Sequence, residues 1–352
     1  MSDAQYQQAL VLLGQGRHDE AGRLLGQASA AGHVPAMSLL GAQLLTGRGA
    51  APEPVAGIRL IMAAAERGGG YACAMAASLL ASGLKGKAEW PRALDLLQRG
   101  AEAGFPSAQD QLRLLAGRGG EDWAALRRAV DLKAWRRPPA RKVLRDDPRL
   151  WIFERFVSPQ VCDWIIARAR DRLAPAKVFD QVTGGPAIND DRINSAAEIG
   201  LTDVDLVLLA VRERIAAAAG QPMLHLEGPQ VLHYHVGERF ILHHDYLDPA
   251  RPGYAIDIAS RGQRLATCLV YLNDDLEGGE TEFPELGIRH RGAPGDALMF
   301  FNVDASGLPD PRTMHAGLSP TSGEKWVLSQ WIRDRVPPGV GDPRYVAALE
   351  GR

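Results

Sequence analysis

The 352-residue chain lacks several features that would assign it to common classes of protein. No stretch approaches the ~20 consecutive apolar residues of a membrane span. The N-terminal sequence MSDAQYQQALVLLGQ has neither the basic start nor the long apolar run of a signal peptide. A formal net charge of -2 provides no positive field for non-specific binding to nucleic acid. These absences predict a soluble, cytoplasmic protein that has no nucleic-acid partner and no membrane contact.

Cysteine is also scarce. Cys73, Cys162 and Cys268 are odd in number, lie far apart and sit in the apolar segments ACAMAA, SPQVCDWII and ATCLVYL. Apolar surroundings of this kind indicate core packing, and a disulfide framework would require more cysteines at regular spacings. We therefore expect three free thiols in a reducing compartment.

The first third of the chain contains an internal repeat with a step of 36 residues. Small residues recur where two helices would approach closely, and glycines recur where a helix would end and the chain would turn. The repeated sets are Gly32, Gly68 and Gly104; Ala36, Ala72 and Ala108; Gly47, Gly83 and Gly119; Leu24, Leu60 and Leu96; and Leu25, Ile61 and Leu97. Each unit is predicted to be an antiparallel helix pair that buries its apolar face by stacking on its neighbours.

The phrases ASAAGHVPA, AAERGGGYA and GAEAGFPSA resemble the Sel-one-like branch of the tetratricopeptide-type repeats. The resemblance covers roughly residues 4 to 120, and we assign residues 1–120 to this domain. Gly57 departs from the pattern, since alanine stands at the matching positions Ala21 and Ala93. The resemblance implies a concave surface that recruits a peptide or protein. A solenoid that only stabilises or dimerises the rest of the chain is the alternative.

After residue 120 the repeat pattern ends, and the predicted regions are a linker at 121–147, a second domain at 148–336 and a tail at 337–352. Ser158 before Pro159 predicts a helix start, and a further helix is expected from about Asp203 to Ala219. Five short strands are expected in QVLHYHV, RFILHHD, RLATCLVYL, DALMFFN and KWVLSQWIR. Helices followed by many short strands predict an α+β domain whose sheet closes into a double-stranded jelly roll.

A candidate metal site lies in RFILHHD. On a strand, His243 and Asp245 would point to the same face while His244 points away. His315 follows in TMHAGLSP, where a jelly roll can bring it opposite that pair. Two histidines and one carboxylate form the facial triad of non-haem iron(II) oxygenases, which leaves positions open for a co-substrate and oxygen.

Lys325 begins the apolar segment KWVLSQWIR, ten residues after His315. A buried ammonium is costly unless an anion pairs with it. The distal carboxylate of 2-oxoglutarate would provide that anion while the other end of the molecule chelates iron. A lysine on an edge strand whose ammonium reaches water is the alternative.

With these residues in place, EGPQVLHYHVGERFILHHDYLDP, RLATCLVYLNDDLEGGETEFP, GDALMFFNVD, TMHAG and GEKWVLSQWIR resemble the catalytic domain of prolyl 4-hydroxylases over about residues 148 to 335. The resemblance implies iron(II) as the metal, 2-oxoglutarate and O2 as co-substrates, and ascorbate as a reductant. It also implies an enzyme that oxidises 2-oxoglutarate to succinate and hydroxylates an unactivated C–H bond.

The same resemblance implies roles for individual residues. His243, Asp245 and His315 would bind iron. Lys325 would bind 2-oxoglutarate in a pocket that also contains Tyr234, Tyr271, Thr281 and Trp331. Arg192, Glu227, Phe240, Arg264 and Arg333 would lie near the substrate. The segment from Thr183 to Pro186 and the loop from Asp248 to Gln263 are expected to close as lids.

Two departures from the family bear on the substrate. Phe240 replaces a tyrosine that many prolyl hydroxylases carry, and AGLSP follows His315 where AGCPV is more usual. Three interpretations stay open. The chain could hydroxylate a prolyl or other side chain in a polypeptide recruited by the repeats, or a free amino acid or small natural product. It could also be a repeat scaffold with an inert oxygenase fold.

Overall fold

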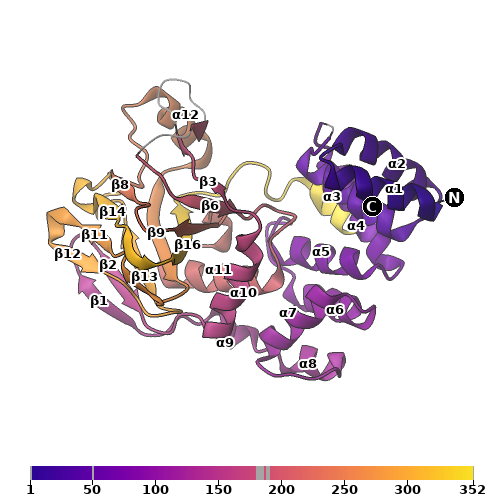
Figure 1. The fold of residues 1–352 in the computed structure, drawn as a ribbon, viewed down its shortest axis with the longest axis horizontal. Helices are drawn as coiled ribbons and strands as arrows, with labels where there is room; N and C mark the ends of the chain where they lie inside the picture. Colours follow the sequence, from indigo (N-terminus) through magenta and orange to yellow (C-terminus); the bar gives the residue numbers. More distant parts are fainter. Residues whose placement is uncertain (1, 50, 180–185, 188–190, 352) are drawn as a thin grey trace. The chain divides into compact units, whose positions relative to one another are not determined.

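The computed structural model describes residues 2–49, 51–179, 186–187 and 191–351. It divides into two compact units (Figure 1). The first comprises Met1–Leu132, Leu201–Leu209 and Gly339–Arg352, and the second comprises Lys133–Gly200 and Ala210–Pro338. Helices make up the first unit and antiparallel strands dominate the second, so the predicted fold class is confirmed. Among the described helices, none combines the length and the apolar character needed to cross a bilayer.

The first unit is built from consecutive antiparallel helices. They are α1 (Ser2–Gly14), α2 (His18–Ala30), α3 (Val34–Thr46), α4 (Pro54–Glu66), α5 (Gly70–Ala81), α6 (Trp90–Glu102), α7 (Pro106–Ala116), α8 (Trp123–Ala129) and the C-terminal α13 (Pro343–Leu349). The step of 36 residues corresponds to one helix pair. Gly32, Gly68 and Gly104 follow α2, α4 and α6 with φ values of 82°, 82° and 80°, a left-handed conformation that glycine adopts without a steric penalty.

The departure at Gly57 has a structural cause. Gly57 of α4 lies against Gly41 of α3, and a Cβ atom built on Gly57 would stand 2.7 Å from the Gly41 carbonyl oxygen. The backbones of α3 and α4 therefore approach too closely for the alanine found at the matching positions of the other units. Apolar positions of the repeat, including Leu25, Ile61 and Leu97, are fully buried between the helices.

The expected linker and tail both contain regular structure. Residues 121–147 include α8, α9 (Leu132–Arg136) and strand β1 (Arg141–Arg145). The C-terminal segment forms α13, which packs on α4 within the first unit. The ammonium of Lys85 bridges Glu89 and Glu350 at 2.8 and 3.0 Å, which fastens this end of the chain to the repeats.

The second unit contains two sheets that form the faces of a jelly roll. The larger has the order β1-β2-β13-β9-β16-β7-β6-β3 and the smaller has the order β12-β11-β14-β8. The further strands are β2 (Leu150–Phe153), β3 (Ala174–Pro175), β6 (Ser195–Glu198), β7 (Gln230–Tyr234), β8 (Phe240–His243), β9 (Arg264–Tyr271), β11 (Thr281–Phe283), β12 (Ile288–His290), β13 (Ala297–Phe301), β14 (His315–Gly317) and β16 (Lys325–Arg333). Short ribbons pair β4 (Val178–Phe179) with β5 (Pro186–Ala187) and β10 (Leu276–Gly278) with β15 (Pro320–Gly323).

Helices α10 (Pro159–Arg170), α11 (Leu206–Ala219) and α12 (Pro252–Arg261) accompany these sheets, and short 3-10 turns lie at Met223–His225, Pro284–Leu286 and Pro311–Thr313. Helix α10 begins as predicted, since Ser158 Oγ accepts a hydrogen bond from the Val161 amide. It packs against β6 and β7 of the larger sheet. The predicted strand at 325–333 has the observed bounds of β16.

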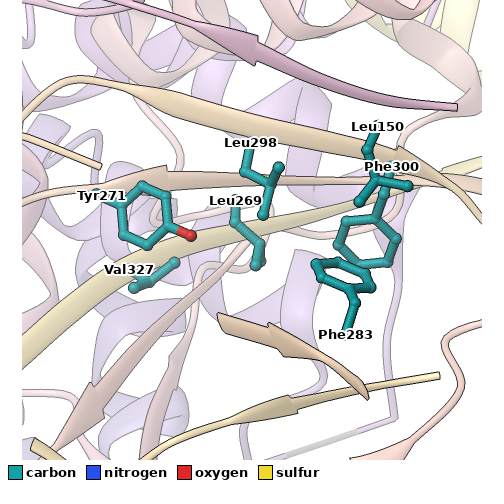
Figure 2. Packing of buried hydrophobic residues seen from close by; sticks show 7 residues of the cluster. All are labelled: Leu150, Leu269, Tyr271, Phe283, Leu298, Phe300 and Val327. Carbon is teal, nitrogen blue, oxygen red and sulfur yellow. The ribbon is translucent and has the colours of Figure 1, made fainter. Parts of the chain in front are cut away.

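Apolar side chains fill the space between the two sheets. Figure 2 shows Leu298 and Phe300 of β13 beside Leu269 of β9, with Phe283 of β11 approaching Phe300 from the smaller sheet. The rings of Phe283 and Phe300 meet edge to face with centroids 5.1 Å apart. Both rings also contact His315, at 5.5 and 4.6 Å. The hydrophobic core therefore holds the imidazole of His315 in place.

Candidate metal centre and its pocket

Three predicted ligand residues line one pocket of the second unit. The side chains of His243, Asp245 and His315 each offer one ligand atom, and these atoms all lie within 4.8 Å of one another. Asp245 Oδ1 lies 3.6 Å from His243 Nε2, and Asp245 Oδ2 lies 3.6 Å from His315 Nε2. Strand β8 ends at His243, so Asp245 stands just beyond the strand and not on it as expected. The two side chains still converge.

Backbone carbonyls orient both imidazoles. Nδ1 of His243 lies 2.8 Å from the carbonyl oxygen of Ile241, and Nδ1 of His315 lies 3.0 Å from that of Thr313. A carbonyl oxygen can only accept, so each Nδ1 carries the proton and each Nε2 lone pair faces the centre. This arrangement is typical of histidines that bind a metal.

Two polar residues that the sequence did not indicate, Thr267 and Asn302, fix the carboxylate of Asp245 through hydrogen bonds. Thr267 Oγ1 on β9 donates to Asp245 Oδ2 at 2.7 Å, and Asn302 Nδ2 donates to Thr267 Oγ1 at 3.1 Å. Thr267 and Asn302 are fully buried. The available signal was a hydroxyl in the middle of the apolar strand RLATCLVYL, because a buried polar group needs a partner.

Electrostatics fix the protonation states of the triad. Burial lowers the pKa of His243 and of His315, so both rings are neutral at pH 7. Burial alone would raise the pKa of Asp245, but His315, His243, the Arg264 guanidinium and the hydrogen bond from Thr267 together hold the pKa below its usual value. Two neutral imidazoles and one carboxylate give a donor set of charge −1, which suits a divalent cation.

The same pocket contains a buried cation. Lys325, at the start of β16, is 4% exposed, and burial lowers the pKa of its ammonium to about 8. Its Nζ lies 4.9 Å from the centroid of the Tyr234 ring. Among the described residues, no carboxylate lies close enough to Lys325 Nζ to form an ion pair with it. An anion bound in the pocket would compensate this charge.

The other residues expected around 2-oxoglutarate lie on strands of both sheets. Tyr234 of β7, Thr281 of β11 and Trp331 of β16 line the same pocket as Lys325. Burial raises the pKa of Tyr234 to about 12, which keeps its hydroxyl protonated. Tyr271 does not line the pocket, and its hydroxyl lies 3.1 Å from Thr281 Oγ1. It therefore acts on the pocket wall through Thr281.

Two of the expected substrate positions line the pocket beside the metal ligands. The ring of Phe240 stacks on the imidazole of His243, with centroids 3.5 Å apart and an interplanar angle of 13°. The guanidinium of Arg192 lies 4.9 Å from the Phe240 ring and is 5% exposed. A tyrosine in place of Phe240 would add a hydroxyl near the centre, whereas phenylalanine leaves an apolar wall.

The other three expected substrate positions form a buried ion network and do not line the pocket. Glu227 accepts hydrogen bonds from Arg264 Nε at 2.7 Å and from Arg333 Nε at 2.6 Å. Arg264 stacks on the Trp331 ring at 3.6 Å. Burial would raise the pKa of Glu227, but the two guanidinium groups lower it to about 2. The network fixes the wall of the pocket that Trp331 supplies.

The segments expected as lids have different outcomes. Thr183 to Gly185 lie outside the described residues, so that prediction is not addressed by the structure. The expected loop from Asp248 to Gln263 contains helix α12. Arg333 Nη2 on β16 donates to Asp257 Oδ2 on α12 at 2.8 Å, which joins this helix to the buried network.

The arrangement fits the groups that the sequence implied. Free Nε2 atoms on two neutral imidazoles, beside an ionised carboxylate, match the ligands that ferrous iron prefers. The ammonium of Lys325, which is buried in the same pocket, matches the distal carboxylate of 2-oxoglutarate. The fit therefore rests on the donor atoms of the triad and on the positive charge of Lys325.

Sequence matches to a known family and to a curated protein point in the same direction. A family described as "2OG-Fe(II) oxygenase superfamily" matches residues 229–333. Prolyl 4-hydroxylase 1 of Arabidopsis thaliana is 34% identical over 210 residues, which is 55% of this chain and 72% of that protein. The viral collagen prolyl hydroxylase of Paramecium bursaria Chlorella virus-1, in its 2OG complex, is 26% identical with a TM-score of 0.41, covering 52% of this chain and 95% of that chain. A Sel1 repeat protein from Oxalobacter formigenes is 22% identical with a TM-score of 0.31, covering 39% and 61%.

Proposed function

Because the chain belongs to the prolyl 4-hydroxylase family of 2OG-Fe(II) oxygenases, we propose that it hydroxylates a prolyl or other side chain in a peptide or protein that the helical repeats recruit. The enzyme class is that of the family, a 2-oxoglutarate-dependent dioxygenase. The observation that carries the site proposal is the triad of His243, Asp245 and His315 in one pocket with the buried ammonium of Lys325.

In this proposal the residues of the pocket divide into two groups. His243 Nε2, His315 Nε2 and an Asp245 oxygen hold the iron, which supplies the oxidative chemistry when it is bound with 2-oxoglutarate and O2. Lys325 Nζ binds the distal carboxylate of 2-oxoglutarate. The hydroxyl of Tyr234 remains protonated and can donate to the same co-substrate. Ascorbate is proposed as the reductant that maintains the ferrous state.

The pocket wall beside the metal ligands bears on the substrate. Phe240 and Arg192 stand where a substrate would approach His243. The apolar Phe240 wall offers contact to a prolyl ring but no hydrogen bond to it. A free amino acid or small natural product is the second candidate, which the lost hydroxyl at this position favours.

Turnover assays test the proposal. The full chain should release succinate only when Fe(II) and 2-oxoglutarate are both present, and proline-containing peptides should stimulate release more than free proline does. Mass spectrometry should then show a gain equal to one oxygen atom on the peptide. Stimulation by free amino acids alone would contradict recruitment of a polypeptide by the repeats. Succinate release that is independent of Fe(II) would contradict the assignment of the metal centre.

A further inference from the structure

A second cluster of metal-binding side chains lies on the face of β7 and β16 opposite the pocket. Tyr234 pairs with Lys325 across these strands, and His233 pairs with Trp326 at the next position. Side chains alternate between the two faces of a sheet. Tyr234 and Lys325 face the pocket, so His233 and Trp326 face the other way.

Two neighbouring residues complete this second cluster. His235 follows the end of β7 and Glu324 precedes the start of β16, and both side chains contact His233. His233 Nε2 lies 2.8 Å from Glu324 Oε2. The rings of His233 and His235 are nearly perpendicular, with centroids 4.4 Å apart. One ligand atom from each of His233, His235 and Glu324 lies within 4.8 Å of the other two.

The described residues satisfy only one nitrogen of the buried His233 imidazole. His233 is 2% exposed, and its Nδ1 is buried without a hydrogen-bond partner in the described part of the chain. The nearest guanidinium, that of Arg170, stands 3.8 Å from Glu324 Oε1 and is itself 58% exposed. An exposed pair at this distance contributes little, so it would not prevent binding of a divalent ion.

We propose that His233, His235 and Glu324 form a second metal site that binds Zn²⁺, separate from the iron centre. Zinc takes imidazole nitrogen and carboxylate oxygen at about 2.0–2.2 Å in tetrahedral geometry, which places its ligands about 3.3 Å apart. The ligand atoms of the cluster, between 2.8 and 4.8 Å apart, require side-chain rotations to reach that spacing. His235 is exposed and Glu324 is partly exposed, so both can rotate.

Zinc is favoured over iron here because nitrogen and oxygen ligand sets generally bind Zn²⁺ more tightly than Fe²⁺. Three protein ligands leave a fourth position for water. The bound ion would fasten the end of β7 to the start of β16. A stabilising role in the fold follows from this position.

The number of zinc equivalents bound by the full chain tests the proposal. Metal-free protein dialysed against Zn²⁺ alone should bind two equivalents, one at each cluster. His243→Ala/His315→Ala should bind one, and adding His235→Ala to that variant should leave none. His225→Ala is the matched control and should bind two, since His225 bonds to Gln221 and belongs to no metal-ligand cluster of the described residues.

A second measurement separates site loss from misfolding. Zn²⁺ should raise the midpoint of thermal unfolding of His243→Ala/His315→Ala, and the shift should disappear with Glu324→Gln, which keeps the size of the side chain. His235 is exposed, so its replacement should leave the circular dichroism spectrum unchanged. If His243→Ala/His315→Ala binds no Zn²⁺, or if binding survives both His235→Ala and Glu324→Gln, the second site does not exist.

Discussion

His315 lies directly opposite His243 in the β8–β14 ladder, and their imidazole centroids are 4.2 Å apart. The pairing of two short strands thus brings together ligands that are 72 positions apart in the chain. A core aromatic on each sheet, Phe283 and Phe300, contacts the His315 ring from behind. The geometry of the proposed iron centre is therefore determined by strand register and by packing of the core.

Replacement of one ligand tests the iron centre. His315→Ala should lower 2-oxoglutarate-dependent succinate release at least about 100-fold, because the loss of a ligand costs more than the 10–100-fold typical of residues behind the ligands. His244→Ala is the matched control, since the His244 ring bonds to the carbonyl of Pro311 and does not belong to the ligand cluster. Succinate assays and iron equivalents bound should be measured together. Equal losses in the two variants would contradict the ligand assignment.

Thr267 is expected to position Asp245. Thr267→Val removes the hydroxyl that donates to Asp245 Oδ2 and should weaken Fe(II) binding by about 10- to 100-fold. Thr267→Ser keeps the hydroxyl and should retain most of the affinity. The apparent dissociation constant for Fe(II), from activity at increasing metal concentration, is the measurement. A Thr267→Val enzyme with unchanged iron affinity would show that this hydrogen bond has only a structural role.

The meeting of the candidate ligands in one pocket could be predicted from the sequence, because these residues lie in short segments whose spacing is itself informative. His243 and Asp245 are two residues apart, and Lys325 is a lone cation at the start of an apolar strand. Thr267 and Asn302 could not be found in this way, because a threonine or asparagine near an apolar strand has no distinctive spacing. Their roles appear only when β9 and β13 pair.

Three of the residues expected near the substrate lie elsewhere in the structure, and their contacts could not be predicted from the sequence. Glu227, Arg264 and Arg333 are charged residues distant in the chain, and nothing in their sequence indicates that they satisfy one another in a buried network. The helix α12 within the expected loop was missed for a related reason. Its ten-residue sequence PGYAIDIASR opens with proline and glycine, a pair that also marks turns, and no residue of it is buried in the structure.

The buried ammonium of Lys325 should lower the free energy of unfolding when 2-oxoglutarate is absent. Its pKa is about 8 in the folded chain against 10.5 for a free lysine, so the unfolded chain binds more protons between those values. The destabilisation is therefore complete below pH 8 and disappears as the pH rises toward 10.5. Lys325→Met should raise the free energy of unfolding at pH 7 by up to roughly 3 kcal/mol and abolish turnover. Chemical denaturation measures the first effect.

The same pKa predicts how 2-oxoglutarate binding depends on pH. The ammonium that would hold the distal carboxylate is present below pH 8 and is lost as the pH rises through 8. The dissociation constant of 2-oxoglutarate should therefore increase between pH 7 and pH 9. Titrations with Lys325→Met should show weak binding and no such dependence. A wild-type affinity that is constant over this range would contradict the assignment of Lys325.

Glu227 should stabilise the fold through its two arginines. Glu227→Gln leaves Arg264 and Arg333 without their shared carboxylate and should lower the free energy of unfolding by about 3–5 kcal/mol. Because the folded pKa of about 2 is below the usual 4.5, this stabilisation is present above pH 4.5 and is lost as the pH falls toward 2. Glu20→Gln, which breaks an exposed pair with Arg17, is the control and should leave the free energy of unfolding nearly unchanged.

The close approach of α3 and α4 provides a test of the repeat domain with a matched pair of glycines. Gly57→Ala would place a Cβ 2.7 Å from the Gly41 carbonyl oxygen and 3.0 Å from the Leu45 amide nitrogen, so the backbones must separate, at a cost of about 1–3 kcal/mol. Gly26→Ala in α2 meets no atom within 4 Å and should stabilise the chain by up to about 1 kcal/mol through helix propensity. Both are helical glycine-to-alanine changes, so opposite signs in the free energy of unfolding would isolate the packing of α3 against α4. If both changes stabilise the chain, α3 and α4 can separate without a loss of stability. The close approach of these helices would then not explain why glycine stands at position 57, where the matching positions are Ala21 and Ala93.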